Sequence, residues 1–256
     1  MYSLRDKVVF ITGASSGIGQ SCARAFAGEG AKILMAARRK DRLNALASEL
    51  KTDLGASSHC LQLDVRDQAA VERAVAGLPA DWAAIEVLVN NAGLSRGLDK
   101  LHEGKLGDWE EMIDTNLKGL LYVSRAVIPG MVKRAAGHII NIGSIAGHEI
   151  YPGGNVYCAT KFAVNAISRG LRMDLSGTPL RVSTVDPGMV ETEFSLVRFR
   201  GDGEKAEKVY QGLKALSPDD VAAAVVFCAT RPPHVNISEI IVMPQAQASP
   251  MLVHRT

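Results

Sequence analysis

Tyr157 and Lys161 stand four residues apart in the stretch VYCATKF, residues 156–162. On a helix, this spacing places both side chains on one face, with Cβ atoms about 5–6 Å apart. A nearby ammonium favours the charged form of a phenol, whose free pKa is about 10, and so lowers that pKa. The pair predicts proton transfer by a tuned phenol. The alternative for these two residues alone is a core tyrosine beside a solvated lysine.

A glycine-rich turn, TGASSGIGQ, follows the first apolar run and opens a helical pattern, with Gly13, Gly17 and Gly19. Glycines here let the backbone approach a pyrophosphate, which binds the free N–H groups of the helix start. A glycine motif alone also fits a turn without a ligand. Its place between a strand pattern and a helix pattern favours dinucleotide binding.

The second apolar run ends in MAARRKDRL, where NAD sites usually carry an acid for the ribose 2′-hydroxyl. Ala37 replaces that acid, and Arg38 and Arg39 offer charged donors for a 2′-phosphate. The sequence therefore predicts NADP(H). The alternative is that the two arginines only solvate a helix entrance.

Polar and small residues end the next two apolar runs. Asp64 is placed to accept from an adenine amino group while Val65 packs on the ring, and the alternative for Asp64 is a cap for the helix that starts near Asp67. Asn91 and Gly93, in NNAG, would let the backbone approach the middle of the dinucleotide.

Short β-rich runs that are apolar at nearly every position alternate with helical stretches along the chain. This pattern predicts an α/β protein, a single-domain doubly wound Rossmann fold over residues 1–256, with a seven-stranded parallel sheet and helices on both faces. Residues 192–215 are expected to form a substrate lid that is irregular through Gly201 and Gly203 before it turns helical. Residues 244–256 form a C-terminal tail. Ser217 is expected to cap a helix that begins at Pro218.

Composition excludes several classes of function. The net charge of +2 and the absence of basic clusters argue against nucleic acid and membrane partners. The four cysteines include no C-x-x-C pair, and His148 with Glu149 lacks the H-E-x-x-H pattern, so no metal site is expected. Cys158 is expected to pack as a small apolar group. No signal-peptide pattern is present, and we expect a cytoplasmic protein.

The segments TGASSGIG, NNAG, YCATK and PGMVET, with Asn116 and Ser144, occur in one order along the chain. In this set the chain resembles the short-chain dehydrogenase/reductase family over nearly its whole length. The resemblance implies that Tyr157 is the general acid and base and that Lys161 tunes it and binds the nicotinamide ribose. It implies that Ser144 donates to the substrate oxygen and that Asn116, in a long helix, holds a water of a proton relay.

The resemblance also implies where NADP(H) binds. The backbone of Val190 and the hydroxyl of Thr192 would pair with the nicotinamide carboxamide, although Thr192 could instead cap a lid helix. The implied cofactor-binding residues are Gly13, Ser15, Ser16, Gly17, Ile18, Gly19, Arg38, Arg39, Asp64, Val65, Asn91, Gly93, Tyr157, Lys161, Pro187, Gly188, Val190 and Thr192. Ser144 and Tyr157 would also contact the substrate.

The lid and tail resemble the branch of NADP-dependent 3-hydroxy acid dehydrogenases, which act on serine, allo-threonine and 3-hydroxypropionate-type acids. The receptor for an acid's carboxylate is then expected to be Arg198, Arg200 or the backbone at Gly153 and Gly154, unless both arginines are only solvated. Alternatives are a broad carbonyl or diketone reductase and a non-catalytic NADP-binding sensor. Apolar residues on several faces of two long helices, together with the family resemblance, predict a homotetramer in which the tail reaches a neighbouring subunit.

Overall fold

The computed structural model describes residues 2–256, in which seven strands form one parallel sheet of order β3-β2-β1-β4-β5-β6-β7. The strands are β1 (Val8–Thr12), β2 (Lys32–Ala37), β3 (Ser58–Gln62), β4 (Ile85–Asn90), β5 (His138–Ile142), β6 (Arg181–Pro187) and β7 (Glu239–Val242). The predicted α/β fold with a seven-stranded parallel sheet is confirmed.

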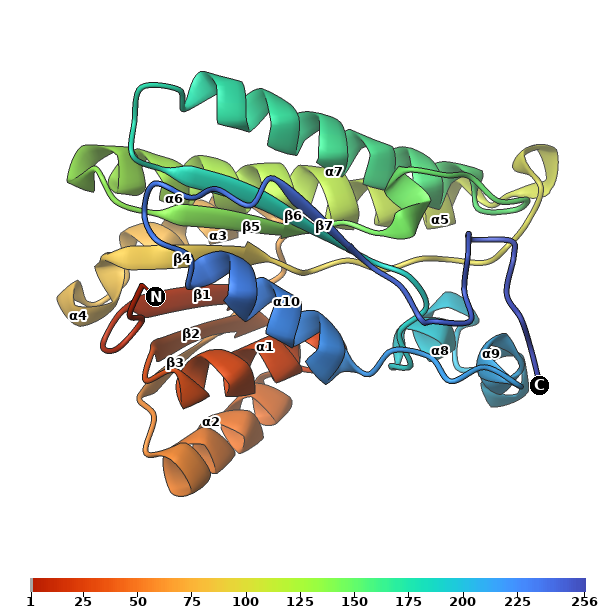
Figure 1. Ribbon diagram of the computed structural model, residues 1–256, viewed down its shortest axis with the longest axis horizontal. Coiled ribbons are helices and arrows are strands. Elements are labelled where there is room, and N and C mark those ends of the chain that lie inside the picture. Colours follow the sequence, from red (N-terminus) through yellow and green to blue (C-terminus); the bar gives the residue numbers. More distant parts are fainter. Residues whose placement is uncertain (1) are drawn as a thin grey trace.

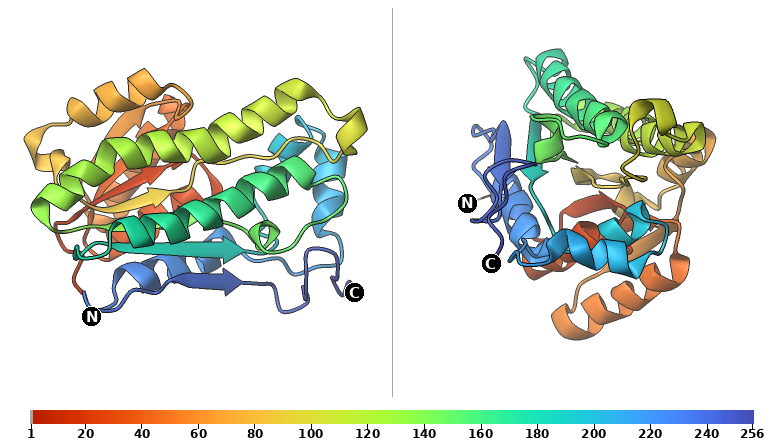
Figure 2. Two further views of the ribbon diagram at one scale, coloured as in Figure 1. Left: turned by 90° about the horizontal axis from the view of Figure 1, so that it is seen from above. Right: turned by 90° about the vertical axis from the view of Figure 1, so that its right-hand side faces the viewer.

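Helices cover both faces of the sheet (Figures 1 and 2). One face carries α1 (Gly17–Gly28), α2 (Lys40–Leu54) and α10 (Pro218–Ala229), and the other carries α3 (Gln68–Ala76), α5 (Leu106–Ile113), α6 (Leu120–Arg134) and α7 (Asn155–Asp174). The short helix α4 (Ala80–Ala83) leads into β4. This double cover explains why the strand patterns are apolar without alternation.

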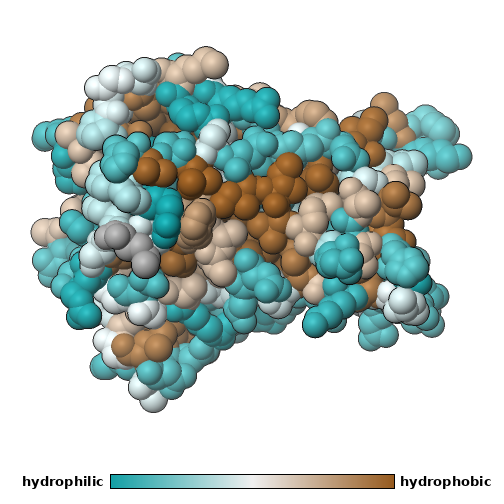
Figure 3. All heavy atoms as spheres, in the orientation of Figure 1, coloured by the Kyte–Doolittle hydropathy of each residue, from teal (hydrophilic) through white to brown (hydrophobic). Residues whose placement is uncertain are grey.

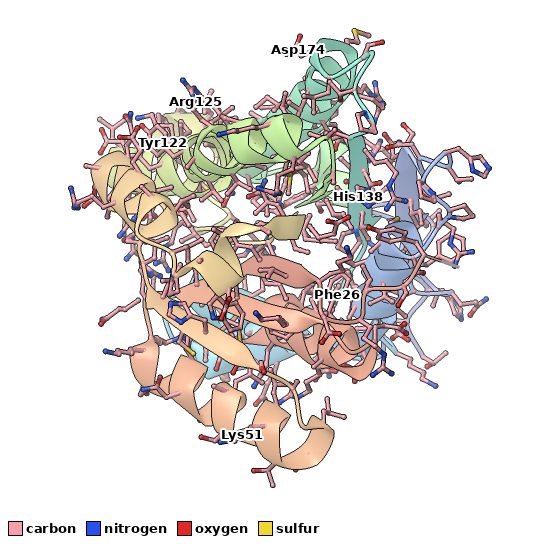
Figure 4. The ribbon with its side chains drawn as sticks, turned by 90° about the vertical axis from the view of Figure 1, so that its left-hand side faces the viewer. Phe26, Lys51, Tyr122, Arg125, His138 and Asp174 are labelled. Atoms are coloured by element: carbon pink, nitrogen blue, oxygen red, sulfur yellow. The ribbon has the colours of Figure 1, made fainter. Side chains whose placement is uncertain are left out.

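Two apolar cores lie on opposite faces of the sheet. Phe26 of α1 is fully buried and points toward the sheet, whereas Lys51 of α2 points outward (Figure 4). Burial of a side chain of this size contributes about 1.5–3 kcal/mol. The cores fix the helices and therefore the loops that leave the carboxyl ends of the strands.

Strands β1 to β3 are added toward one edge of the sheet and β4 to β7 toward the other, so the strand order reverses between the neighbouring strands β1 and β4. Ligands in open α/β sheets bind at such a point, beyond the carboxyl ends of the strands. The segment predicted to be a lid, residues 192–215 and called the lid below, contains α8 (Phe194–Arg198) and α9 (Gly203–Tyr210) and lies beyond this end of the sheet (Figure 1). The expectation that the lid turns helical only after its glycines was wrong, because α8 precedes Gly201.

The structure decides two questions about helix starts. Ser217 and Asp220 form a reciprocal capping box at the start of α10, as expected from Ser217 and Pro218. At α3 the cap is Asp67, whose side chain accepts from the Ala70 N–H, so the capping alternative for Asp64 was wrong.

The sequence led us to expect Asn116 in a long α-helix, but it does not lie in regular α-helix. A π-helical turn, Asp114–Gly119, joins α5 to α6 and contains it. Turns of this kind, with i→i+5 hydrogen bonds, appear inside α-helices and frequently at functional sites.

The C-terminal tail folds back on the lid of the same chain. Gln247 and Val253 form an antiparallel bridge, the Thr256 N–H donates to the Gly212 carbonyl at 3.0 Å, and Arg255 donates to the Val209 carbonyl at 3.1 Å. Of the helices within residues 2–256, none is long and apolar enough to cross a bilayer.

Candidate active site

A cleft of about 350 Å³ opens at the carboxyl end of the sheet. Every residue predicted to be catalytic or to bind the cofactor lines it except Gly19 and Asn116, whereas the expected carboxylate receptors Arg198, Arg200, Gly153 and Gly154 do not line it. The predicted residues along its wall are Gly13, Ser15, Ser16, Gly17, Ile18, Arg38, Arg39, Asp64, Val65, Asn91, Gly93, Ser144, Tyr157, Lys161, Pro187, Gly188, Val190 and Thr192. The fold therefore brings together residues that are up to 179 positions apart, Gly13 and Thr192.

The start of α1 presents unused backbone donors to the cleft. Ser16 is the N-cap residue but makes no side-chain cap, and the first turn contains no acid. Free N–H groups at a helix start bind anions. Gly13 adopts φ +66°, where a Cβ would also lie 2.9 Å from the Ala92 Cα atom.

Gly19 faces away from the cleft and serves packing instead. A Cβ on it would come within 2.5 Å of the Gly13 carbonyl oxygen and of the Asn91 amide nitrogen. That amide donates to the Thr12 carbonyl at 2.9 Å, which ties the ends of β1 and β4 together. The third glycine of the loop thus lets α1 approach the sheet.

Positive charge gathers where the second strand ends. Arg39 donates to the Ser16 hydroxyl at 2.7 Å and to the Ser15 hydroxyl at 3.2 Å, and Arg38 is exposed at the cleft wall. Two guanidinium groups, two hydroxyls and a helix start, with no acid at Ala37, fit a ribose 2′-phosphate.

Glu193 is an acid near this phosphate-fitting group that the sequence did not single out. Its carboxylate pairs with Arg39 at 2.9 Å and with Arg42 at 2.6 Å. Hydrogen bonding from Arg42, reinforced by Arg39, lowers the pKa of Glu193 against the effect of burial. This acid at the start of α8 joins the lid to the nucleotide-binding end of the cleft.

Asp64 is held by its own neighbour in sequence. Arg66 donates to the Asp64 carboxylate at 2.6 Å and 3.0 Å. Burial raises the pKa of Asp64, but hydrogen bonds and charge from Arg66 outweigh it and the pKa is lowered. The carboxylate stays ionised beside Val65 on the cleft wall, and its contact with an adenine stays a prediction.

Tyr157 and Lys161 both project from α7 and are both buried. The Lys161 ammonium donates to the Ile142 carbonyl, at the end of β5, at 2.9 Å, and its nitrogen lies 5.9 Å from the centroid of the Tyr157 ring. Burial lowers the pKa of Lys161 to about 8, against the opposing charge of Asp186. The spacing in sequence thus yields one helix face, as predicted.

The expectation of a lowered pKa for Tyr157 was wrong as far as the chain's own groups are concerned. Burial raises the pKa of Tyr157, and Tyr151 adds to this, while Arg198 and Ser144 act in the lowering direction. Burial wins because Tyr157 is enclosed, with Phe194 of the lid 5.6 Å away between ring centroids. At neutral pH the chain's own environment keeps this phenol protonated.

Ser144 is fixed by an acid that the sequence did not indicate as a site residue. The Ser144 N–H donates to Asp186 at 3.1 Å, and the Ser144 hydroxyl accepts from the Ala146 N–H at 3.1 Å. Asp186 is fully buried on β6 and also lies 3.2 Å from His148. Its signal in the sequence was a lone acid inside the apolar run RVSTVDP.

His148, Asp186 and Glu239 come close enough for a shared cation, which the sequence did not suggest. Hydrogen bonds and charge already connect the three groups, and Arg169 pairs with Glu239 at 3.3 Å. Asp186 has its pKa raised by burial, with His148 acting in the opposite direction. The cluster supports Ser144 from behind the cleft.

Asn116 joins the π-helical turn to the segment that follows β4 and to α7. Its side chain accepts from the Leu94 N–H at 2.8 Å and donates to the Leu94 carbonyl at 2.8 Å and to the Thr160 hydroxyl at 3.1 Å. These bonds occupy both donors of the amide. A role for Asn116 in holding water stays a prediction.

The residues expected around a nicotinamide carboxamide follow β6. The Val190 carbonyl accepts from the Tyr210 hydroxyl at 2.9 Å, and the Thr192 hydroxyl accepts from the Phe194 N–H at 3.1 Å. The N-cap residue of α8 is Glu193 and α8 has no side-chain cap, so Thr192 only binds the first N–H of the helix, and it also lines the cleft beside Pro187 and Gly188.

Comparison with known proteins identifies what this arrangement is similar to. Residues 7–201 match the family described as short chain dehydrogenase. The NADP-dependent 3-hydroxy acid dehydrogenase YdfG of Escherichia coli strain K12 is 52% identical over 97% of this chain and 99% of its own length.

Two further relatives match over most of their length. The serine 3-dehydrogenase of Agrobacterium fabrum is 42% identical over 94% of each chain. A solved structure described as the closed form of serine dehydrogenase complexed with NADP+ is 51% identical, covers 97% of this chain and 100% of its own, and superposes with a TM-score of 0.91.

Proposed function

This chain belongs to the short-chain dehydrogenase family, and from that premise we propose that it is an NADP(H)-dependent oxidoreductase that acts on small 3-hydroxy acids. Candidate substrates are serine, allo-threonine and 3-hydroxypropionate, with the corresponding aldehydes or ketones in the reverse direction. The names of the relatives, a 3-hydroxy acid dehydrogenase and a serine 3-dehydrogenase, support this substrate class.

One observation carries the proposal. A single cleft holds a phosphate-fitting cluster, Arg38 and Arg39 with Ser15 and Ser16, at one end and a buried phenol and ammonium at the other. The first set suits the 2′-phosphate of NADP(H) and the second suits proton transfer. NADP(H) supplies or accepts the hydride at nicotinamide C4 when it is bound.

The protein's own residues handle the proton. The Tyr157 hydroxyl gives its proton to the substrate oxygen in reduction, and in oxidation its phenolate takes the proton of the substrate hydroxyl. Lys161 places positive charge behind the phenol, which stabilises the phenolate that forms. The Ser144 hydroxyl donates to the same substrate oxygen, and its backbone bond to Asp186 holds it in place.

Two other functions remain as alternatives. A broad carbonyl or diketone reductase would use the same residues, since the chemistry requires only a carbonyl carbon. A non-catalytic NADP-binding sensor has no need for a complete set of Asn116, Ser144, Tyr157 and Lys161, and the presence of all four favours an enzyme.

The test is a substrate panel with purified protein. NADP+ reduction is followed by absorbance with serine, allo-threonine, 3-hydroxypropionate and 3-hydroxyisobutyrate, and NADPH oxidation is followed with neutral diketones. We expect higher kcat/KM for at least one acid than for any diketone. Activity on diketones alone would favour the reductase, and no turnover with any compound would favour the sensor.

We also propose a cytoplasmic homotetramer. Apolar side chains are exposed on α5, α6 and α7, including Leu106, Leu121 and Met173, and on a second face that includes Phe227 of α10 and Ile241 of β7. Figure 3 shows hydrophobic side chains gathered on the face where α10 and β7 lie. Two separate apolar faces suit an assembly with two kinds of twofold contact. The four free cysteines suit a reducing compartment.

A further inference from the structure

Three arginines belong to the lid or donate to it: Arg198 and Arg200 lie on it, and Arg96 donates to the Val197 carbonyl. None of them is among the residues that line the cleft, but Arg198 lies beside Tyr157, which does line it. Arg96 pairs with Glu111 at 2.6 Å, and Arg200 pairs with the buried carboxylate of Asp108. Within residues 2–256, Arg198 makes no ion pair with a carboxylate. Arg198 is therefore the one of these three cations that still lacks an anion.

Aromatic rings surround the Arg198 guanidinium. Its central carbon lies 5.0 Å from the Phe194 ring centroid, 5.6 Å from that of Tyr157 and 6.0 Å from that of Tyr151. Nη2 donates to the Tyr151 hydroxyl at 3.1 Å. Nε is buried and has no hydrogen-bond partner among residues 2–256.

An unpartnered buried N–H on a charged group is unfavourable, and a carboxylate is the ligand that would satisfy it best. The Nε–H and one Nη2–H of a guanidinium point the same way and form a fork that matches two carboxylate oxygens. Tyr151 accepts from one of the two Nη2 hydrogens and the Nε–H has no partner among residues 2–256, so at least one donor on this edge of Arg198 is free.

We propose that Arg198 binds the carboxylate of the substrate and makes this enzyme selective for hydroxy acids over neutral alcohols. This inference rests on the proposed function. In a 3-hydroxy acid the carboxyl carbon lies roughly 4 Å from the reacting oxygen, given ordinary bond lengths. The Arg198 guanidinium carbon lies 5.6 Å from the ring centroid of Tyr157, the residue proposed to handle that oxygen, so a carboxylate three carbons away would be held on the Arg198 side of the phenol.

The other receptors expected from the sequence do not have this freedom. Asp108 occupies Arg200, which fastens the lid to α5. The Gly154 N–H already donates to the Tyr151 carbonyl at 3.1 Å, and Gly153 packs against Leu98, since a Cβ there would lie 2.8 Å from the Leu98 carbonyl carbon. Of the two lid arginines, Arg198 is the one that combines an unpartnered buried donor with a place beside Tyr157.

The first experiment compares an acid with its neutral ester. We expect Arg198→Gln to lower the ratio of kcat/KM for 3-hydroxypropionate to that for methyl 3-hydroxypropionate by about 100-fold, the loss of two charge-assisted hydrogen bonds. Arg198→Lys retains the charge without the fork and should give an intermediate ratio. Arg200→Gln, the matched control, should leave the ratio within about 3-fold of the wild-type value, because its charge serves Asp108.

Equal losses for acid and ester in Arg198→Gln would overturn the proposal, since a residue that only holds the lid affects both substrates alike. A loss of acid preference in Arg200→Gln, with none in Arg198→Gln, would also overturn it. If the wild type oxidises neither compound with NADP+, the proposed function itself fails. If the wild type oxidises both and the ratio is unchanged in Arg198→Gln, only the role of Arg198 fails.

A second measurement needs no variant. Wild-type protein with NADP+ is treated with phenylglyoxal, which modifies arginine, and the modified peptides are mapped. We expect propionate, but not methyl propionate, to slow modification of Arg198 and to leave that of Arg200 unchanged. Equal protection of Arg198 by the acid and the ester would contradict a carboxylate contact.

Discussion

Removing the buried ammonium of Lys161 should make the protein more stable at neutral pH, although it removes a group that we propose takes part in turnover. Lys161 is only 8% exposed, and burial lowers its pKa to about 8. An unfolded chain binds this proton with a pKa of about 10.4. The buried charge of Lys161 therefore lowers the free energy of unfolding of the wild type, and Lys161→Met would remove this effect.

The pH window and the sign follow from these two pKa values. Below pH 8 both states hold the proton and the full cost, roughly 3 kcal/mol, opposes folding of the wild type. Between pH 8 and about 10.4 the unfolded chain holds more protons, so the wild type gains stability as the pH rises. The advantage of Lys161→Met over the wild type should therefore shrink by roughly 3 kcal/mol from pH 7 to pH 10.5.

A second effect adds a pH-independent difference in unfolding free energy between the two proteins. Lys161→Met leaves the Ile142 carbonyl without its donor, which costs about 1–3 kcal/mol at every pH. The net gain at pH 7 is therefore about 1 kcal/mol, and by pH 10.5 the variant should be the less stable protein. The cysteines and other titrating groups are common to both proteins and largely cancel in the difference.

Urea unfolding followed by tryptophan fluorescence and circular dichroism, without NADP and with a reductant, measures the difference at each pH. Lys51→Met on α2 is the matched control, because Lys51 is exposed and points away from the core (Figure 4). Its difference from the wild type should stay flat with pH. A flat difference for Lys161→Met as well would refute the reasoning, since it would mean that Lys161 binds its proton equally in both states.

Three further outcomes are expected. Tyr157→Phe removes the proton donor and should lower kcat by about 10²–10⁴-fold, with the Kd for NADPH within about 3-fold of wild type; a variant that kept half its activity would exclude Tyr157 as the acid. Glu193→Gln frees Arg39 and should lower the Kd for NADPH, measured by calorimetry at low salt, by up to about 5-fold, because the ion pair is this exposed. The Kd for NADH should not change. Weaker NADPH binding would show that Glu193 supports the site instead. Asn116→Ala leaves the N–H and carbonyl of Leu94 unpaired and should destabilise the protein by about 2–4 kcal/mol in urea unfolding. A change below about 0.5 kcal/mol would show that these hydrogen bonds do not stabilise the fold.

The sheet and the cleft could be predicted from the sequence because burial dictates them. Each run of apolar residues became a strand, and the polar residues that follow the strands met at one edge of the sheet. The sequence pattern could not show that Arg198 and Arg200, which stand two positions apart, have different contacts. Their roles depend on Tyr151 and Asp108, which lie on elements far away in the sequence.

Other misses have the same origin. Glu193 meets Arg39 across 154 positions, a contact that only the folded lid creates. Asp186 was hidden in an apolar run because its partners, the Ser144 N–H and His148, come from a neighbouring segment of the sheet edge. The pKa of Tyr157 was predicted from one neighbour, Lys161, whereas the depth of burial determines its direction.

The π-helical turn at Asp114–Gly119 has a consequence for how this chain can change in length. Such a turn amounts to one surplus residue within a helix, so deleting one residue there would restore an ordinary α-helical repeat. The α6 side chains that pack on the sheet, Val123, Val127 and Met131, would keep their mutual spacing. Gene variants that lose one codon in this turn are therefore expected to fold but to lose the hydrogen bonds between Asn116 and Leu94, which follows β4. Insertions within α6 would instead turn its apolar face toward solvent.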